Sequence, residues 1–332
     1  MKARILLTER IAQAGMDMLE QAGDVTVAPS PSDSDLLPLV GDADALLIRS
    51  TNVSIPVMEA GRKLKVIGRH GIGLDNIDVN AASRLGIQVV NTPGANTNAV
   101  AEHALWAMLH CAKNFNRAQK ALCEGKFCVG GSLPGLVQKF GLSTIELKGK
   151  TLGLVGFGRI SRRLAEIARS FQLNVKSYDP LVPDDAFVSM GVLRAATVDE
   201  VLRDSDFVSL HVPYMKETHH IIGERELALM KPRSYLINTS RGGIVDEDAL
   251  CRALRNGQIA GAALDVFEKE PPPADCQFFG LENVLVTPHM AAMTDLGLLN
   301  MAVDVSAGII AALEGKRPEF LANPDVWEKR RR

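Results

Sequence analysis

The sequence predicts an α/β protein that contains two doubly wound parallel sheets. Short runs of apolar and β-branched residues, typical of buried strands, alternate with longer stretches that have helical spacing. The chain has 332 residues, which is too long for one compact core. The strand-like runs also fall into two separate series, as expected of two domains.

Both series consist of short runs with a helical stretch between one run and the next, a spacing that favours parallel pairing. The first series of expected strands is Arg4–Thr8, Val25–Ala28, Ala45–Ile48, Lys65–Gly68 and Ile87–Val90. The second series is Thr151–Val155, Asn174–Tyr178, Phe207–His211, Ser234–Asn238, Ala260–Asp265 and Val284–Thr287.

The segments outside the two series indicate how the domains are connected. Asn98–Asn116 has helical spacing and follows the turn-rich stretch Asn91–Thr97, which suits a crossing between domains. Cys123–Ser143 lacks periodicity and is expected to be an irregular surface arm. Met301–Leu313 is expected to be a helix that returns to the first domain. The predicted domains are therefore 1–98 with 291–332, and 99–290.

Composition and charge exclude several classes of protein. The net charge of −2 provides no overall field that would attract nucleic acid or an anionic membrane. The five cysteines include no CxxC pair, which argues against a disulfide framework and a metal site and suits the cytoplasm. No apolar run is expected to reach the roughly 18 residues of a membrane span. The basic end, Glu328–Arg332, is expected to be a solvated tail.

A dinucleotide site is predicted where Thr151–Glu166 forms a strand, a glycine turn and a helix. Gly156 permits a tight turn, and Gly158 lets the backbone approach a pyrophosphate at the positive end of the helix dipole. The third position of the motif is Ser161, so the helix is expected to lie slightly away from the strand.

The expected cofactor is NAD rather than NADP. Asp179 ends the next predicted strand, 23 residues after Gly156. A carboxylate at this spacing accepts hydrogen bonds from the adenosine ribose hydroxyls and repels a 2′-phosphate. The following residues, Pro180–Pro183, offer no cation to relieve that repulsion.

A second glycine cluster, Gly68–Asp75, also follows a strand but lacks the third glycine of a dinucleotide motif. Its closely spaced N–H groups could hold a small carboxylate, and Arg69 could assist. An ordinary turn is the alternative.

Three complementary side chains follow successive strands of the second series: Arg241, Glu270 and His289. Ligands of open α/β sheets bind outside the carboxyl ends of the strands, so these residues are expected to share a site. Hydride transfer to a carbonyl needs a proton donor, usually histidine near neutral pH, a cation that orients the substrate, and a group that holds the pKa of the donor in range. Each residue alone also has an ordinary structural explanation. Together with the dinucleotide site they indicate hydride transfer to or from a carbonyl carbon.

Three stretches resemble the D-isomer-specific 2-hydroxyacid dehydrogenases, particularly their phosphoglycerate-dehydrogenase-like branch: Asn238–Glu247, Gly261–Pro272 and Asn283–His289. The resemblance extends over nearly the whole chain. It implies a flavodoxin-like substrate-binding domain made from both chain ends, a Rossmann NAD-binding domain inserted between them, and a homodimer. The chain ends too soon after Met301–Leu313 for the serine-sensing domain of some relatives, so regulation by that route is not expected.

The resemblance also implies residue roles. Arg241 would bind the substrate carboxylate and carbonyl, His289 would be the acid/base, and Glu270 would pair with His289. Contacts with NAD are expected from Gly156, Gly158, Arg159, Ile160, Asp179, Val212, Thr239, Ser240, Arg241, Asp265 and His289. Substrate contacts are expected from Ser50, Gly71, Ile72, Gly73 and Arg241.

Two other functions are open at this point. An NAD-responsive scaffold of the same fold could keep the same side chains without catalysis. A hydrolase could use Ser240, although the nucleophile elbow requires glycine where Asn238 stands. The substrate is also open between phosphoglycerate, glycerate or hydroxypyruvate, and sulfolactate. Arg49, Arg69 and His70 could meet a second anionic group of that substrate, or be surface charges.

Overall fold

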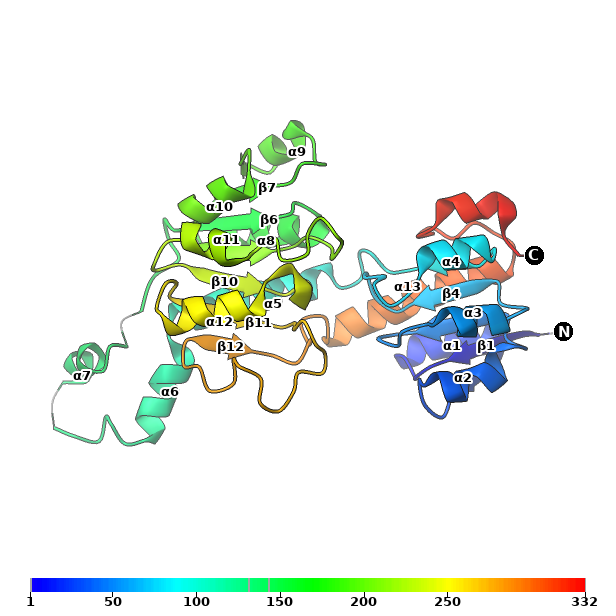
Figure 1. Ribbon diagram of the computed structural model, residues 1–332, viewed down its shortest axis with the longest axis horizontal. Coiled ribbons are helices and arrows are strands. Elements are labelled where there is room, and N and C mark those ends of the chain that lie inside the picture. Colours follow the sequence, from blue (N-terminus) through cyan, green and yellow to red (C-terminus); the bar gives the residue numbers. More distant parts are fainter. Residues whose placement is uncertain (1, 131, 143, 332) are drawn as a thin grey trace. The chain divides into compact units, whose positions relative to one another are not determined.

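The structure is a computed structural model that describes residues 2–130, 132–142 and 144–331. The chain forms two compact units, each built around one parallel sheet (Figure 1). Unit 1 comprises the residues up to Thr97 and from Ala292 onward, and unit 2 is Asn98–Ala291. These boundaries lie one residue from the predicted ones. The two predicted parallel sheets are thereby confirmed.

Unit 1 contains a five-stranded sheet in the order β2-β1-β3-β4-β5. Its strands are β1 (Ala3–Leu7), β2 (Gly23–Val27), β3 (Ala45–Ile48), β4 (Val66–Arg69) and β5 (Gln88–Val90). Its helices are α1 (Gln13–Ala22), α2 (Asp33–Val40), α3 (Ile55–Ala60), α4 (Val79–Arg84) and α13 (Asp295–Leu313), with a final 3₁₀ helix at Pro324–Lys329.

Helix α13 begins six residues before the predicted start and joins the core of unit 1. With 19 residues and a mean hydropathy of 1.8, it is long and apolar enough to cross a membrane, so the expectation that no segment reaches this length was wrong. In the structure α13 packs on α1 and β4, and Val305 and Ile309 are buried. A Cβ at Gly68 would lie 2.5 Å from Cδ1 of Ile309, so β4 needs a glycine where this helix crosses it.

Unit 2 contains a seven-stranded sheet in the order β12-β11-β10-β9-β6-β7-β8. Its strands are β6 (Thr151–Val155), β7 (Asn174–Tyr178), β8 (Leu193–Arg194), β9 (Phe207–Leu210), β10 (Tyr235–Asn238), β11 (Gly261–Leu264) and β12 (Val284–Val286). Strand β8 was not predicted, because two exposed residues carry no hydrophobic pattern. The strand order reverses at β6, where open α/β sheets bind their ligands.

The helices of unit 2 lie between these strands and before them. They are α5 (Thr97–Ala112), α6 (Phe115–Cys123), α7 (Leu133–Lys139), α8 (Arg159–Ser170), α9 (Asp184–Ser189), α10 (Val198–Asp204), α11 (Glu224–Leu229) and α12 (Glu247–Arg255), with a 3₁₀ turn at Gly242–Ile244. Helix α5 ends before the predicted end at Asn116.

The arm expected to be irregular contains helix α7, so that prediction was wrong in part. Ser132 caps the helix by accepting a hydrogen bond from the N–H of Gly135, and proline follows in the first turn. These are common start signals of a helix. The predicted end of the arm, Ser143, lies outside the described residues.

In the basic end of the chain, Glu328 and Lys329 are exposed as expected, but Arg330 and Arg331 are held against unit 1, so the expected solvated tail was wrong in part; Arg332 lies outside the described residues. The Arg331 guanidinium donates to the carbonyl oxygens of Leu85 at 2.7 Å and Leu64 at 3.2 Å. The Arg330 guanidinium lies 3.5 Å from the centre of the Trp327 ring. Backbone carbonyls and an aromatic face therefore fix these cations.

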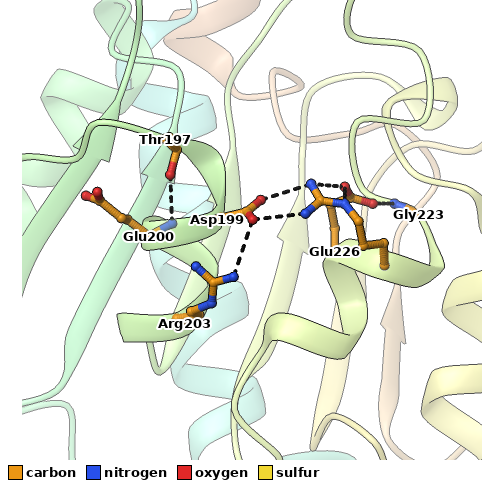
Figure 2. Close-up of polar contacts among 7 residues, drawn as sticks. Thr197, Asp199, Glu200, Arg203, Gly223 and Glu226 are labelled. Atoms are coloured by element: carbon orange, nitrogen blue, oxygen red, sulfur yellow. Dashed lines mark hydrogen bonds and ion pairs between the residues drawn. The ribbon is translucent and has the colours of Figure 1, made fainter.

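Exposed polar contacts join the N-terminal turns of α10 and α11 (Figure 2). The carboxylate of Asp199 in α10 accepts two hydrogen bonds from Arg225 of α11, at 2.9 and 3.0 Å. Thr197 caps α10, and Glu226 accepts a hydrogen bond at 3.1 Å from the N–H of Gly223 at the start of α11. The local charge pattern thus fixes how these two helices begin.

Candidate active site

The predicted site residues lie at the carboxyl ends of strands in both units. In unit 1, Ser50 follows β3 and Gly71–Gly73 follow β4. In unit 2, the predicted catalytic and cofactor residues follow β6, β7, β9, β10, β11 and β12. Each set is gathered at one edge of its own sheet.

The glycine turn after β6 has the shape that a dinucleotide phosphate requires. Gly156 has a φ of 95°, and a Cβ there would lie 2.7 Å from the carbonyl oxygen of His211. Around the Cβ position of Gly158, in contrast, no atom lies within 4 Å. Helix α8 starts at Arg159, so its N-terminal N–H groups border this open space. The residues present therefore fit a pyrophosphate.

Ser161, at the third position of the motif, is completely buried. Its hydroxyl donates to the carbonyl oxygen of Gly158 at 3.1 Å. The extra polar atom is therefore satisfied within the first turn of α8.

Asp179 is fixed beside the glycine turn by backbone donors. One carboxylate oxygen accepts from the N–H of Phe157 at 2.8 Å, and the other accepts from the N–H of Leu181 at 2.9 Å. A carboxylate oxygen accepts more than one hydrogen bond, so each retains capacity for a ribose hydroxyl. The negative charge thus has a set position at the end of β7.

His289 and Glu270 form a hydrogen-bonded pair, with Nδ1 of the imidazole 2.7 Å from Oε2 of the carboxylate. The other oxygen of Glu270 accepts from the N–H of Phe267 at 3.1 Å. Burial raises the pKa of Glu270, but the hydrogen bond and charge of His289, the Phe267 N–H and the charge of Arg241 together lower it below its ordinary value. Glu270 is therefore a carboxylate at neutral pH, and it accepts the Nδ1 proton.

Arg241 is brought to this pair by a close approach of two loops. Asn238 donates to the carbonyl oxygen of Arg241 at 2.8 Å and accepts from the N–H of Ser240 at 3.0 Å, which closes the turn after β10. A Cβ at Gly242 would lie 1.8 Å from the carbonyl carbon of Phe267. Only glycine allows the turn after β10 to pack on the loop that leads to Glu270. Sequence reasoning missed both Asn238 and Gly242 in this role.

Two further predicted cofactor residues, Ser240 and Val212, bond to each other. The Ser240 hydroxyl donates to the carbonyl oxygen of Val212 at 2.7 Å. A hydroxyl whose proton is held by a backbone carbonyl is not activated by a base. This geometry disfavours the hydrolase function that uses Ser240.

Asp265 was predicted to contact the cofactor, and in the structure its carboxylate bonds to the loop that follows β12. The residue is 1% exposed. Its carboxylate accepts hydrogen bonds from the N–H groups of Met290 and Ala291, both at 2.8 Å, and from the Thr287 hydroxyl at 2.6 Å. It therefore fixes the loop that carries His289.

In unit 1, the glycine cluster after β4 is a bonded turn. The carbonyl oxygens of Gly71 and Ile72 accept from the N–H of Thr92 at 3.1 Å and from the Asn91 side chain at 2.8 Å. The Arg69 guanidinium fills the place of a side chain at Gly71, whose φ is 139°. The predicted substrate residues of this unit thus share one ordered edge.

Arg49 and His70 were considered as contacts for a second anionic group of the substrate, and the structure shows the surroundings of both. Arg49 forms an ion pair with Glu9 at 3.0 Å. Burial, followed by the charges of Arg49 and Arg69, lowers the pKa of His70 to about 4. His70 is therefore neutral at neutral pH and cannot supply positive charge to a second anionic group.

The fold and this site define the class of protein, and comparison with known proteins identifies the family. Residues 105–291 match the model of the D-isomer specific 2-hydroxyacid dehydrogenase NAD-binding domain. The chain belongs to this family, so the resemblance found in the sequence is confirmed.

Individual relatives are similar over nearly the whole chain. Identity is 40% over 329 residues with a D-3-phosphoglycerate dehydrogenase from Methanocaldococcus jannaschii, covering 98% of this chain and 61% of that protein. It is 39% over 332 residues with a glyoxylate reductase from Thermococcus litoralis, covering 98% of each. The chain thus spans 61%, 58%, 58% and 49% of the length of four phosphoglycerate dehydrogenases that it matches.

A solved structure shares the complete architecture. The NADPH-dependent glyoxylate/hydroxypyruvate reductase from Sinorhizobium meliloti, in complex with NADP and malonate, has a TM-score of 0.87 and 27% identity. The similarity covers 100% of this chain and 99% of that one. The predicted fold class is confirmed by this neighbour.

Proposed function

We propose that this chain is an NAD-dependent oxidoreductase that interconverts a small 2-hydroxy acid and its 2-oxo acid. The observation that carries the proposal is the 2.7 Å pair of His289 and Glu270, beside Arg241, in the unit whose glycine turn is open at Gly158. Membership of the 2-hydroxyacid dehydrogenase family supports it.

The side chains divide the chemistry between them. Because Nδ1–H of His289 is held by Glu270, Nε2 is left to give a proton to the substrate oxygen in reduction and to take it in oxidation. The Arg241 guanidinium suits the substrate carboxylate, because its planar donors match two oxygens. The turn at Gly156–Ile160 would hold the NAD pyrophosphate, and Asp179 the ribose. NAD, when bound, supplies or accepts the hydride.

The substrate class follows from what the relatives are named for. The names of these relatives specify phosphoglycerate, which is a 2-hydroxy acid, and glyoxylate and hydroxypyruvate, which are 2-oxo acids. All three are small acids with oxygen on the 2-carbon. Of the three side chains considered for a second anionic group, His70 is neutral and Arg49 is paired with Glu9, so Arg69 is the one to test first.

A kinetic panel tests the function. Oxidation of NADH is measured with glyoxylate, hydroxypyruvate, phosphohydroxypyruvate and sulfopyruvate, and NADH binding is measured separately by fluorescence. At least one acid should be reduced with saturation kinetics. Binding of NADH without reduction of any of these acids would favour the alternative, an NAD-responsive scaffold.

We also propose a homodimer in the cytoplasm. Large apolar side chains are exposed along α5, α6 and the arm that follows: Trp106, Phe115, Leu122, Val129 and Leu133. Burial of such a surface by a second copy would stabilise a dimer. The five cysteines are free thiols, which supports a reducing compartment.

A further inference from the structure

The loop Thr287–Ala291 carries His289 in a conformation that needs support. His289 has a φ of 50°, in the left-handed region that costs a non-glycine residue about 1 kcal/mol or more. Its N–H donates to the carbonyl oxygen of Asp265 at 2.8 Å, and the next two N–H groups donate to the Asp265 carboxylate. Asp265 therefore determines where the imidazole of His289 is held.

The Asp265 carboxylate is itself approached from helix α5. Nε2 of His103 lies 3.8 Å from its Oδ1 atom and 3.3 Å from the hydroxyl oxygen of Thr287. The imidazole of His103 is largely buried, with 12% of its side chain exposed. His103 thus links helix α5 to the loop that carries His289, although it is 184 residues from Thr287 in sequence.

The directions of these hydrogen bonds are fixed by the acceptors. The Thr287 hydroxyl has one proton, which it donates to Asp265 at 2.6 Å. Its oxygen can then only accept from His103, so Nε2 of His103 must carry a proton. Burial lowers the pKa of His103 although Asp265 opposes this, so the imidazole is neutral with its proton on Nε2. A chain of donors then runs from His103 through Thr287 to Asp265.

We propose that His103 is a positioning residue for the acid/base loop. By donating to Thr287, it orients the hydroxyl that binds the Asp265 carboxylate, and this carboxylate in turn holds the two amides that follow His289. The inference rests on the proposed function of His289. It assigns His103 no contact with substrate or cofactor.

Amide hydrogen exchange tests the proposal without any catalytic assay. In His103→Leu, which removes the donor, the amides of Met290 and Ala291 should exchange about tenfold faster than in wild type. His103→Gln keeps a donor at a similar reach and should restore slow exchange. His110→Leu, the same change on the same helix, is the matched control and should leave these amides unchanged. Equal exchange in His103→Leu and wild type would overturn the proposal.

Thr287→Val supplies a second route if the His103 variants fold poorly. It should accelerate exchange of the same amides. The double variant with His103→Leu should exchange no faster than either single variant, because both changes act through one chain of hydrogen bonds. Fully additive effects would overturn the proposal.

Kinetics then connect the loop to catalysis. His103→Leu should lower kcat about tenfold, with the KM for NADH unchanged, and His103→Gln should recover most of the loss. Fast exchange with unchanged kcat would refute the positioning role. If no 2-oxo acid is reduced even by wild type, the proposed function fails while the exchange result still decides whether His103 holds the loop.

Discussion

At the scale of single residues, the surroundings of each histidine decide what its imidazole can do. His211 and His289 both follow strands of the unit 2 sheet. Burial lowers the pKa of His211 to about 4, and its Nε2 is 2.9 Å from the hydroxyl of Ser209. His289 is 45% exposed in its side chain and bonds to a carboxylate. Of these two histidines, His289 is the one that combines solvent access with a carboxylate partner.

Replacement of His289 should therefore remove the acid without removing the cofactor site. His289→Ala should lower kcat by about 10²–10⁴-fold, the usual contribution of a positioned acid or base. The Kd for NADH should change little, because the glycine turn lies after β6 and not on this loop. Steady-state rates and NADH fluorescence measure the two effects. A kcat near that of wild type would exclude His289 as the acid.

The carboxylate of Glu270 should matter more for rate than for stability. Glu270→Gln removes the carboxylate that accepts the Nδ1–H of His289, so kcat for reduction should fall, as steady-state kinetics would measure. Since the pair is more than one third exposed, the free energy of unfolding should drop by less than about 1 kcal/mol.

The pH dependence of that stability difference has a defined sign. The folded pKa of Glu270 lies below its ordinary 4.5, so the stabilisation is complete above that value and is lost as the pH falls through the folded pKa. Urea unfolding of both proteins at neutral and acidic pH measures it. A difference that grows on acidification would contradict the assignment.

Asp179 should set the cofactor preference. Its fixed carboxylate should make kcat/KM for NADH at least about tenfold higher than for NADPH, or about 1.4 kcal/mol. Asp179→Ser should reduce the ratio of kcat/KM for NADH to that for NADPH, mainly by raising kcat/KM for NADPH. One structural neighbour is NADPH-dependent, so the preference has to be measured for this chain. Equal kcat/KM for the two cofactors in wild type would exclude this role of Asp179.

At the scale of elements, two glycines of the turn between β6 and α8 should have different roles. Gly156 should be needed for folding and Gly158 for cofactor binding. Gly156→Ala should destabilise the protein by about 1–3 kcal/mol, because φ is positive and the added Cβ meets the carbonyl oxygen of His211. At Gly158 there is room for a Cβ and φ is an ordinary −76°, so the Gly158→Ala variant should fold normally. Its affinity for NADH should fall, because the added methyl group obstructs the pyrophosphate. Thermal unfolding and NADH titration compare the two. Equal loss of stability in both would refute this division.

At the scale of the whole molecule, the exposed apolar residues of α5, α6 and the arm predict self-association. Light scattering at micromolar concentration should give twice the chain mass of 35.8 kDa. Trp106→Glu combined with Leu122→Glu should shift the protein toward monomer. Glu substitution at Leu181, which is 91% exposed and lies on another part of unit 2, is the control. A monomer mass for wild type would contradict the proposal.

Much of this organisation is determined by the sequence alone. Buried strands such as Ala45–Ile48 and Thr151–Val155 have continuous apolar patterns, and the glycine turn at Gly156 follows from local backbone chemistry. Arg241, Glu270 and His289 follow successive strands, so the topology of a parallel sheet alone predicts that they share an edge. Strands, turns and the order of residues along the chain depend mainly on residues close together in sequence. Periodicity and turn residues describe those local relations, so they predict these features.

The tertiary structure decided what depends on distant contacts. The neutral state of His70, the fixed position of Arg331 and the burial of Asp265 arise from other elements, and no local pattern signals them. His103 shows the reason most clearly, because its partner Thr287 is 184 residues away. The free energy of a buried polar group depends on which donors and acceptors surround it, and folding alone brings those groups together.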